Sequence, residues 1–366
     1  MRILLVSGSF PPMQCGIGDY TALLAQAMSR YTNLKIAVLT HTSISSTLTP
    51  QNIETLAIAE NWSWAEIGQL LSAIKQWKPN IIHFQFPTQG YGKQKLPWVL
   101  PLALATYGYP IVQTWHEYVL QNQGLADWKN CLLYLPNVLT PGGLIVVRPD
   151  YTKHLPSIYR LLVASKELRF IPNASAIPSI TLLDKTRQEI RNEIAEGQKF
   201  IAYFGFALPA KGVELLFEVL DPQQHYLVLI CELNQSDAYH AMLLERIRST
   251  HWSTKSKVTG FLGAEHVGRL LAAADAIILP FRKGGGSWNT SLQAASQQGT
   301  FVLTTSNEQH GYDEHNNIYY AQPDNLAEMR QALATYTGHR IPAKNSKEWE
   351  RIARDHVELY SKVVSR

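Results

Sequence analysis

The chain is poor in the features that mark disulfide-stabilised and zinc-binding proteins. Its 366 residues include only three cysteines, Cys15, Cys131 and Cys231, which are widely spaced and odd in number. Neither a disulfide framework nor a zinc-ligand spacing follows from this pattern. A reducing compartment is the natural location of such a chain, so we expect a cytoplasmic protein.

Charged residues are also scarce, at 17% of the chain, and they show little bias of sign. The 33 Lys and Arg against 29 Asp and Glu leave a net charge of +4, with no run of five basic residues. This excess is too small and too dispersed to indicate nucleic-acid binding. It does allow an anionic substrate, or peripheral contact with an anionic membrane surface.

Long uninterrupted apolar runs are absent as well. The run at Met1–Val6 is too short for the core of a signal peptide and is typical of a buried first strand. The stretch Leu96–Val112 is interrupted by prolines and a glycine, so it cannot form a spanning helix of about 20 residues. We expect a protein that is soluble or peripherally bound.

Metal-binding patterns are missing too. No Asp-x-Asp pair follows a predicted strand, and no histidine or carboxylate cluster has metal-ligand spacing. We therefore predict that the protein needs no divalent metal and carries no resident cofactor.

What is present is an alternation of short β-rich runs and longer helical patterns, which indicates parallel α/β sheets covered on both faces. The strands predicted in the first half are Ile3–Ser7, Lys35–Thr40, Ile81–Phe84, Ile111–Trp115 and Leu144–Arg148, with helices at Tyr20–Arg30 and Glu66–Trp77. Those predicted in the second half are Phe200–Phe204, Tyr226–Ile230, Lys257–Phe261, Ala276–Leu279 and Phe301–Thr304, with helices at Gly212–Leu220, Ser236–Ser249, His266–Ala274 and Thr290–Gln298.

The length and the repeated architecture predict two Rossmann-like α/β domains. The first spans residues 1–172 and the second spans residues 173–346, with the boundary near Ile171–Asn173. A last helix is expected at Lys347–Val364, after the second sheet is complete.

A glycine-rich turn follows the first predicted strand, with Gly8–Pro12 and then Gly16–Asp19. Such a turn lets the backbone approach a phosphate or sugar, and the next helix directs its N–H groups at the anion. A tight turn that needs glycine only for positive φ explains the same residues. The third glycine of the dinucleotide fingerprint is absent.

His116 lies within Gln113–Glu117, at the end of the fourth predicted strand. Ligands of open α/β sheets bind outside the carboxyl ends of strands, where a histidine can hydrogen-bond a sugar hydroxyl. The alternative is a histidine that lies in the core with its hydrogen bonds satisfied there.

Lys211 follows Tyr203–Phe206 and precedes a predicted helix. Cations are disfavoured at a helix N-terminus, but pairing with a bound diphosphate would offset this. A solvated surface lysine is the alternative.

The most specific local pattern is Leu279–Ser287, in which a predicted strand leads into three consecutive glycines. A helix with hydroxyl residues at its start follows, and its unpaired N–H groups would form an anion site. A flexible linker is the alternative, although linkers rarely join a buried strand to an alanine-rich helix.

Together these patterns resemble family 4 glycosyltransferases of the GT-B fold, over nearly the whole chain. The residues that carry the likeness are Phe10-Pro11-Pro12 with Gly16-Ile17-Gly18, Pro79-Asn80-Ile81-Ile82-His83, Trp115-His116-Glu117, Phe170-Ile171-Pro172-Asn173, Tyr203-Phe204-Gly205 with Lys211-Gly212, and Leu271–Asp275 before Leu279-Pro280. The aromatic and aliphatic residues of Trp349–Tyr360 resemble the family's last helix, which crosses back to the N-terminal domain.

The resemblance implies two domains that face each other across a cleft, and a sugar transfer from a nucleoside diphosphate donor to an acceptor hydroxyl. Retention at the anomeric carbon and independence of metal are implied as well. The N-terminal domain would bind a carbohydrate or glycosylated acceptor, with residues 347–366 packing back on it, and the C-terminal domain would bind the donor. His116 would face the transferred sugar, and Lys211 would neutralise the leaving diphosphate. The donor-binding residues implied are Gly16, Gly205, Gly260, Phe261, Gly285, Gly286, Ser287, Ser291, Leu292 and Gln293.

Three positions depart from the family. An arginine is replaced by Phe206, and two glutamates are replaced by Gly285 and Gln293. Arg282 and Lys283 lie close by in sequence and could supply the missing positive charge. Because of these departures, a degenerate protein that binds a nucleotide or sugar without catalysis is an alternative to the active enzyme. Another enzyme on this fold, such as a sugar-nucleotide epimerase, is a further alternative.

Acceptors of such enzymes are bound mainly by variable loops of the first domain. The aromatic residues near these loops could stack on sugar rings or belong to the core; they are Trp62, Trp64, Tyr91 and Trp98.

Overall fold

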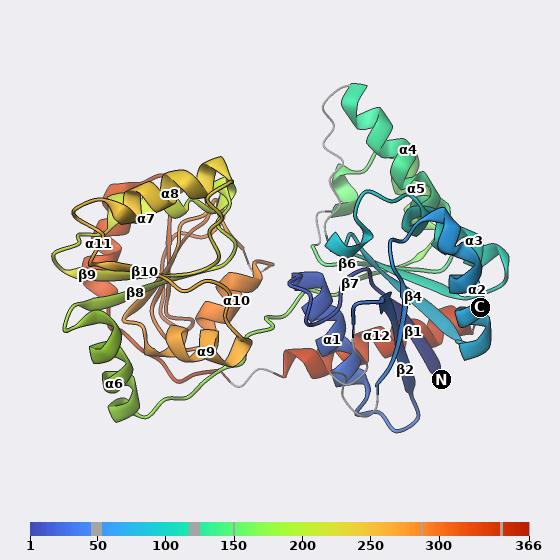
Figure 1. Cartoon of the computed structure of the whole chain (residues 1–366), viewed down its shortest axis with the longest axis horizontal. Helices are drawn as coiled ribbons and strands as arrows, with labels where there is room; N and C mark the ends of the chain where they lie inside the picture. The colour runs from blue at the N-terminus through green and yellow to red at the C-terminus, as the bar shows by residue number, and fades with distance from the viewer. Residues whose placement is uncertain (45–52, 117–124, 149–150, 287, 345–346, 366) are drawn as a thin grey trace. The chain divides into compact units, whose positions relative to one another are not determined.

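The computed structural model describes residues 1–44, 53–116, 125–148, 151–286, 288–344 and 347–365. The chain divides into two compact units, Met1–Ala174 with Lys347–Arg366, and Ser175–Ser346. Each unit is a seven-stranded sheet with helices on both faces (Figure 1). The expected α/β class, with two parallel sheets flanked by helices, is therefore confirmed.

The first sheet is parallel throughout, in the order β3-β2-β1-β4-β5-β6-β7. Its strands are β1 (Arg2–Val6), β2 (Lys35–His41), β3 (Ile53–Ala59), β4 (Ile81–Phe86), β5 (Ile111–Trp115), β6 (Gly143–Val146) and β7 (Glu167–Phe170). The order reverses direction between β1 and β4, which is the point where doubly wound folds bind ligands beyond the carboxyl ends of their strands.

Alternate residues of the central strands face different helices. Leu4 and Val6 belong to the cluster that packs under α2, α3, α4 and α5, whereas Ile3 and Leu5 pack with α1 and α12. The helices are α1 (Gly16–Met28), α2 (Ile67–Trp77), α3 (Leu96–Thr106), α4 (Leu125–Leu139), α5 (Ser157–Ala164) and α12 (Glu348–Val364), with short 3-10 turns η2 (Trp64–Glu66), η3 (Gln89–Tyr91) and η4 (Tyr151–His154). Burial on both faces explains the nearly continuous apolar runs of these strands.

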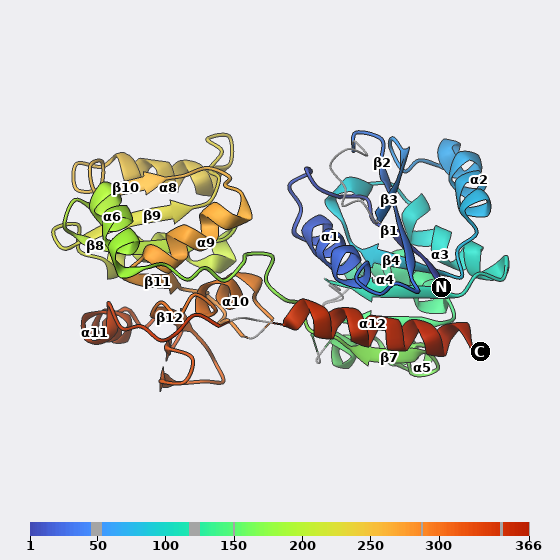
Figure 2. The same cartoon turned by 90° about the horizontal axis from the view of Figure 1, so that it is seen from below.

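The C-terminal helix α12 is part of the first unit (Figure 2). It contacts α1, β5, β6 and β7. Its buried residues recur three or four positions apart, as expected of an amphipathic helix that covers a core; they are Ile352, Ala353, His356, Leu359, Tyr360 and Val363.

The second sheet has the order β10-β9-β8-β11-β12-β14-β13, and only the hairpin of β13 with β14 is antiparallel. The strands are β8 (Lys199–Phe204), β9 (His225–Ile230), β10 (Ser256–Val258), β11 (Ala276–Leu279), β12 (Val302–Thr305), β13 (Gly311–Asp313) and β14 (Ile318–Ala321). The helices are α6 (Asp184–Ala195), α7 (Leu216–Val219), α8 (Ala238–Arg248), α9 (Ala264–Ala273), α10 (Thr290–Ser296) and α11 (Leu326–Tyr336), with 3-10 turns η5 (Pro209–Lys211) and η6 (Val213–Leu215). The order reverses direction between β8 and β11.

One expected element differs in the structure. The predicted helix Gly212–Leu220 is instead η6 followed by the four-residue α7, because Gly212 is in the left-handed region at φ 65°. The proline-rich stretch after Leu96 begins with the 11-residue helix α3, which tolerates one proline in its first turn and Pro101 inside. None of the helices in the described ranges is both long and apolar enough to cross a membrane.

Candidate functional site

The glycine-rich turn lies beyond the carboxyl end of β1, where the first sheet reverses direction. Gly16 opens α1, and a Cβ added to it would have no heavy atom within 4 Å. Gly18 is close to its neighbours, with the backbone N of Phe10 only 3.2 Å from an added Cβ. Neither glycine has positive φ, so a need for left-handed backbone does not explain them. Gly18 therefore lies in tight backbone packing, where a side chain would force its neighbours to shift, whereas Gly16 has open space around it.

His116 follows β5 and is buried, with only 6% of its surface exposed. Its Nε2 lies 2.8 Å from Oε1 of Gln85, and its backbone N–H donates to the carbonyl of Phe86 on the neighbouring strand. The ring of Tyr20, from α1, contacts the imidazole edge-on at 4.6 Å between centroids. The structure therefore brings the first turn of α1 and His116 together. Glu117, the next residue of the motif, lies outside the described residues.

Burial lowers the pKa of His116 to about 3, helped by the nearby His356 and opposed by a hydrogen bond with the Asn173 side chain. The imidazole is therefore neutral at physiological pH, and it is too weak a base to accept a proton efficiently. Its chemistry is that of a fixed hydrogen-bonding group.

Two other buried histidines adjoin His116. His83 on β4 has Nδ1 at 2.5 Å from the Tyr360 hydroxyl and Nε2 at 2.7 Å from Oγ1 of Thr114. His356 on α12 has Nε2 at 3.3 Å from the Tyr20 hydroxyl, and its Nδ1 lies 2.7 Å from the carbonyl of Ile352. Burial also lowers the pKa of His83 well below its usual value and that of His356 to about 4.

Sequence reasoning did not assign this network to the site. His83 belongs to one of the motifs of the resemblance, and Tyr360 and His356 lie in the expected last helix, but the sequence alone gives none of them, nor Gln85, a place beside His116. The available signal was the alternation of His83 and Gln85 on one face of β4, which places two polar groups in a buried strand.

The second group of predicted residues gathers where the second sheet reverses direction, because β8 and β11 are paired neighbours. Gly205, at φ 138°, ends β8, and a Cβ added there would lie 3.6 Å from Cβ of Ser291 in α10. Lys211 has its Nζ 4.7 Å from the centroid of the Phe281 ring, which follows β11. The two sequence patterns thus form one cluster.

The environment of Lys211 differs from the one expected. Lys211 ends the turn η5, and no regular helix begins immediately after it. The expectation that Lys211 stands at the N-terminus of a helix is therefore wrong. The contact between Lys211 and Phe281 is a cation–π interaction, which stabilises the lysine without a ligand. Its position beside the loop after β11 remains suited to an anion.

The glycine loop is more fully hydrogen-bonded than expected. The N–H of Gly285 donates to the carbonyl of Thr305 at 2.7 Å, and that of Gly286 donates to Oδ1 of Asn289 at 2.8 Å. A Cβ on Gly285 or Gly286 would overlap the ring of Phe281 or of Trp288. These glycines therefore permit close packing of aromatic rings within the unit. Ser287 lies outside the described residues.

Helix α10 begins after Asn289, whose side chain bonds Gly286 and caps no N–H of the helix. Ser291 and Leu292 are buried in the first turn, and Gln293 is half-buried one position later. Their place at the start of the helix agrees with the expected arrangement after a glycine loop, with the amide of Gln293 where relatives have a carboxylate.

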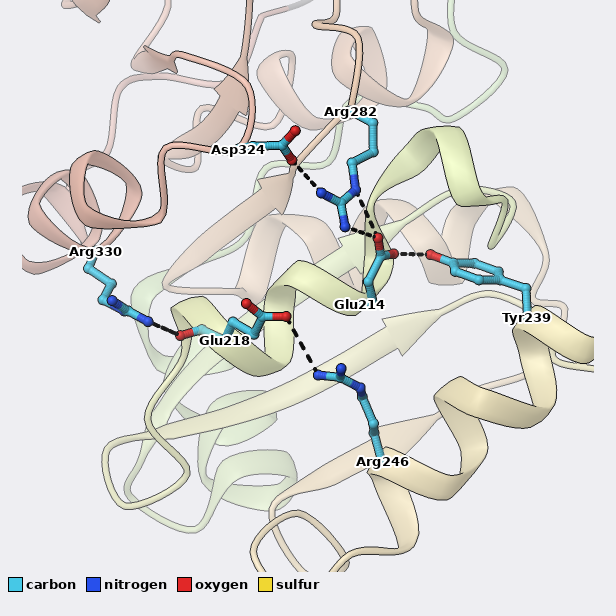
Figure 3. A network of polar contacts seen from close by, with 7 residues as sticks. All are labelled: Glu214, Glu218, Tyr239, Arg246, Arg282, Asp324 and Arg330. Atoms are coloured by element: carbon cyan, nitrogen blue, oxygen red, sulfur yellow. Dashed lines mark hydrogen bonds and ion pairs between the residues drawn. The ribbon is translucent and has the colours of Figure 1, made fainter.

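Arg282 is already paired by carboxylates (Figure 3). Its Nε donates to Oε1 of Glu214 at 2.9 Å and its Nη1 lies 2.5 Å from Oδ1 of Asp324. The Tyr239 hydroxyl donates to the second carboxylate oxygen of Glu214. These partners raise the pKa of Arg282 and hold its guanidinium, so the idea that Arg282 replaces the missing arginine is not supported.

Aromatic side chains stand exposed at the same edge of the second sheet. Phe206 follows β8 and is 65% exposed, and Phe261 follows Gly260 after β10 and is 62% exposed. Gly260 has φ 71°, a conformation that favours glycine. Phe206 thus presents an exposed apolar ring at the position where the family resemblance leads one to expect an arginine.

The aromatic residues considered for the acceptor divide between two environments. Trp62 and Tyr91 are buried and contact each other edge-on, and Trp98 packs on Phe86, so these belong to the core. Trp64 is 53% exposed. Within the described part of the chain, no group of three or more His, Cys, Asp or Glu could hold a metal ion.

The fold is similar to that of solved GT-B glycosyltransferases. Sucrose-phosphate synthase from Thermosynechococcus elongatus is similar over 100% of this chain and 99% of its own, at 15% identity and a TM-score of 0.73. Anabaena HepE in complex with UDP is similar over 100% of this chain and 99% of its own, at 14% identity and a TM-score of 0.66. The catalytic domain of Arabidopsis thaliana starch synthase IV, bound to ADP and acarbose, is similar over 100% of both chains, at 12% identity and a TM-score of 0.68.

No protein-family model and no curated protein sequence matches the chain. At these identities the comparisons establish the GT-B fold, and the expected fold is confirmed.

Proposed function

We propose that this protein is a glycosyltransferase that moves a sugar from a nucleoside diphosphate donor to a hydroxyl of a carbohydrate or glycosylated acceptor, with retention at the anomeric carbon. One observation carries the proposal. The reversal point of the second sheet gathers Gly205, Lys211, the loop Gly284–Gly286 and Ser291, as a doubly wound fold does where it binds a phosphate ligand.

The comparisons support the class of donor. Structures of the same fold hold UDP in HepE and ADP in starch synthase IV, so a nucleoside diphosphate is the ligand to expect at this point. The identity of the nucleotide base must be found by experiment, because the exposed ring of Phe261 can stack on any base.

In this reaction the protein must stabilise the departing diphosphate. Negative charge grows on this group while the sugar becomes oxocarbenium-like, so a nearby cation and oriented N–H groups lower the barrier. Lys211 supplies the cation, moving from the face of Phe281 to the diphosphate. The first turn of α10 supplies N–H groups.

His116 is proposed to orient the transferred sugar. A neutral, buried imidazole can direct a hydrogen bond without taking part in proton transfer, and the low pKa of His116 suits this role. The diphosphate oxygen is then the acceptor for the proton of the attacking hydroxyl.

The proposal is tested by measuring the melting temperature of the full chain with UDP, ADP, GDP and their sugar conjugates. A ligand present at 100 times its dissociation constant should stabilise the protein by about 2.7 kcal/mol. Release of the nucleoside diphosphate from the matching donor, with acceptor sugars added, then measures turnover. Binding without turnover would contradict catalysis, and the absence of any binding would contradict the donor site itself.

A further inference from the structure

A continuous chain of buried hydrogen-bonding groups connects the C-terminal helix to His116. Tyr360 on α12 meets Nδ1 of His83 at 2.5 Å, and Nε2 of His83 lies 3.3 Å from Nε2 of Gln85. The other end of the same amide, Oε1 of Gln85, lies 2.8 Å from Nε2 of His116. All four side chains are buried.

The two ends of a glutamine amide are chemically opposite, because the oxygen only accepts and the nitrogen only donates. With Oε1 facing His116, the proton of that ring must be on Nε2. With the amide nitrogen facing His83, Nε2 of His83 must accept, so the proton of His83 is on Nδ1 and points at Tyr360. If the amide were reversed, both rings would have to exchange their protonated nitrogens together.

Thr114 is compatible with either state, because its hydroxyl can donate or accept at Nε2 of His83, 2.7 Å away. The Tyr360 hydroxyl can also donate or accept, and it is the hydrogen-bond partner of Nδ1 of His83, so its removal changes which tautomer of His83 is satisfied. Both imidazoles are neutral in this dry environment, so the position of the proton, rather than the charge, is what the neighbours can set.

We propose that Tyr360, His83 and Gln85 form a relay that sets which ring nitrogen of His116 carries the proton, and so position His116 from α12. Gln85 and Tyr360 are then positioning residues, because neither contacts the reacting atoms. The catalytic consequence rests on the function proposed above, whereas the coupling of the two rings is a property of the first unit alone.

The relay is tested by NMR of the full chain labelled with ¹⁵N-histidine, which reports the protonated nitrogen of each ring without substrate. In the parent protein we expect the proton of His116 on Nε2 and that of His83 on Nδ1. Gln85→Glu replaces the amide by a carboxylate, which can only accept when it is ionised, so above the pKa of this carboxyl the proton of His83 should move to Nε2 while that of His116 stays. Tyr360→Phe removes the partner of Nδ1 of His83, and the tautomer populations of both rings should change.

Tyr20→Phe is the matched control, because it removes a hydroxyl bound to His356 in the same core but keeps the ring that contacts His116. It should leave the tautomer of His116 unchanged. An unaltered His116 in Tyr360→Phe, or a proton of His83 that stays on Nδ1 in Gln85→Glu, would overturn the relay. If the protein is an active transferase, Tyr360→Phe should lower turnover several-fold while the dissociation constant for the nucleoside diphosphate stays the same, since the proposed diphosphate site is in the second unit. Failure of the relay would leave nucleotide binding intact, so it is distinguishable from failure of the proposed function.

Discussion

Gly16 is a glycine that the packing of the first unit does not require. It has neither positive φ nor a neighbour that a Cβ would overlap, yet it opens α1 at the reversal point of the sheet. The sequence predicts Gly16 in a turn before a helix at Tyr20–Arg30, whereas α1 begins at Gly16 itself, and the sequence could not separate Gly16 from Gly18, which lies in close backbone contact. That distinction depends on three-dimensional neighbours.

Gly16→Ala should leave the fold intact and stabilise the helix by about 0.5–1 kcal/mol, because alanine loses less backbone entropy than glycine. If donor phosphates approach this backbone, the added methyl group should weaken donor binding at least several-fold. Melting temperature and donor titration by calorimetry measure the two effects. Gly68→Ala is the control, because Gly68 is also in the first turn of a helix of this unit with free space around it. Equal donor affinity in both variants would remove Gly16 from the site.

Lys211 was predicted to bind the diphosphate because a helix was expected to begin just after it, and this reason is wrong. The expected helix after it is a 3-10 turn, and Phe281 provides its partner in the absence of ligand. The loop after β11 could not be placed beside Lys211 from sequence, since about 70 residues separate them and only the pairing of β8 with β11 brings them together.

Lys211→Ala should weaken binding of the nucleoside diphosphate by about 1.5–3 kcal/mol, the range for a charge-assisted hydrogen bond. Isothermal calorimetry with the parent's best nucleotide measures the change. Lys283→Ala, an exposed lysine in the neighbouring loop, should change affinity little. A similar loss in both variants would point to general attraction of charge, and no loss in either would exclude Lys211 from the diphosphate.

The elements predicted from sequence are those with an unambiguous hydrophobic pattern. The central strands are buried on both faces and were predicted within one or two residues of their bounds, as was the amphipathic α12. Of the strands that were not predicted, β3, β7 and β13 lie at sheet edges, whereas β14 lies inside the second sheet between β12 and β13. In β7 the apolar residues Leu168 and Phe170 are exposed, so its pattern is not that of a buried strand.

The buried histidines of β4, β5 and α12 should make the first unit sensitive to acid. Folding keeps their pKa values below the value of about 6.5 expected in the unfolded chain. Below pH 6.5 the unfolded chain therefore binds more protons, and the stability present above pH 6.5 is lost as pH falls toward about 4 for His356 and about 3 for His116. Each ring contributes at most about 1.4 kcal/mol per pH unit.

Urea unfolding between pH 7.5 and 5 measures this slope, followed by tryptophan fluorescence, since all tryptophans except Trp252 and Trp288 are in the first unit. His356→Gln should flatten the dependence by one ring's share, whatever its effect on absolute stability. His266→Gln, at an exposed position of the second unit, should leave the pH dependence of stability unchanged. A slope that His356→Gln leaves unchanged would show that the ring is charged or solvated in the folded protein.

At the scale of the whole molecule, the chain keeps the GT-B fold at 12–15% identity to the structures compared. A fold can be retained at such distances because it depends on the order of buried strands and covering helices, which many sequences satisfy. The individual site residues are not retained in the same way, as the phenylalanine at position 206 illustrates.

Donor binding and transfer should proceed without a divalent metal. In the parts of the chain that the structure describes, carboxylates near the second reversal point are engaged by Arg282 and leave no cluster for a cation. EDTA should therefore leave nucleotide affinity and turnover within about twofold of the untreated protein. Loss of activity in EDTA that manganese restores, with magnesium as the parallel control, would contradict this.

The α/β class, the two repeated sheets and the amphipathic last helix can be predicted from local patterns of the chain, because they follow from the periodicity of apolar residues and from glycine at strand ends. Which side chains meet is known only from the folded chain: Lys211 meets Phe281, Arg282 meets Glu214 and Asp324, and His116 meets Gln85. Such contacts join residues that are distant in the chain, and they depend on strand order and on the rotation of each side chain about its own bonds, which no local pattern encodes.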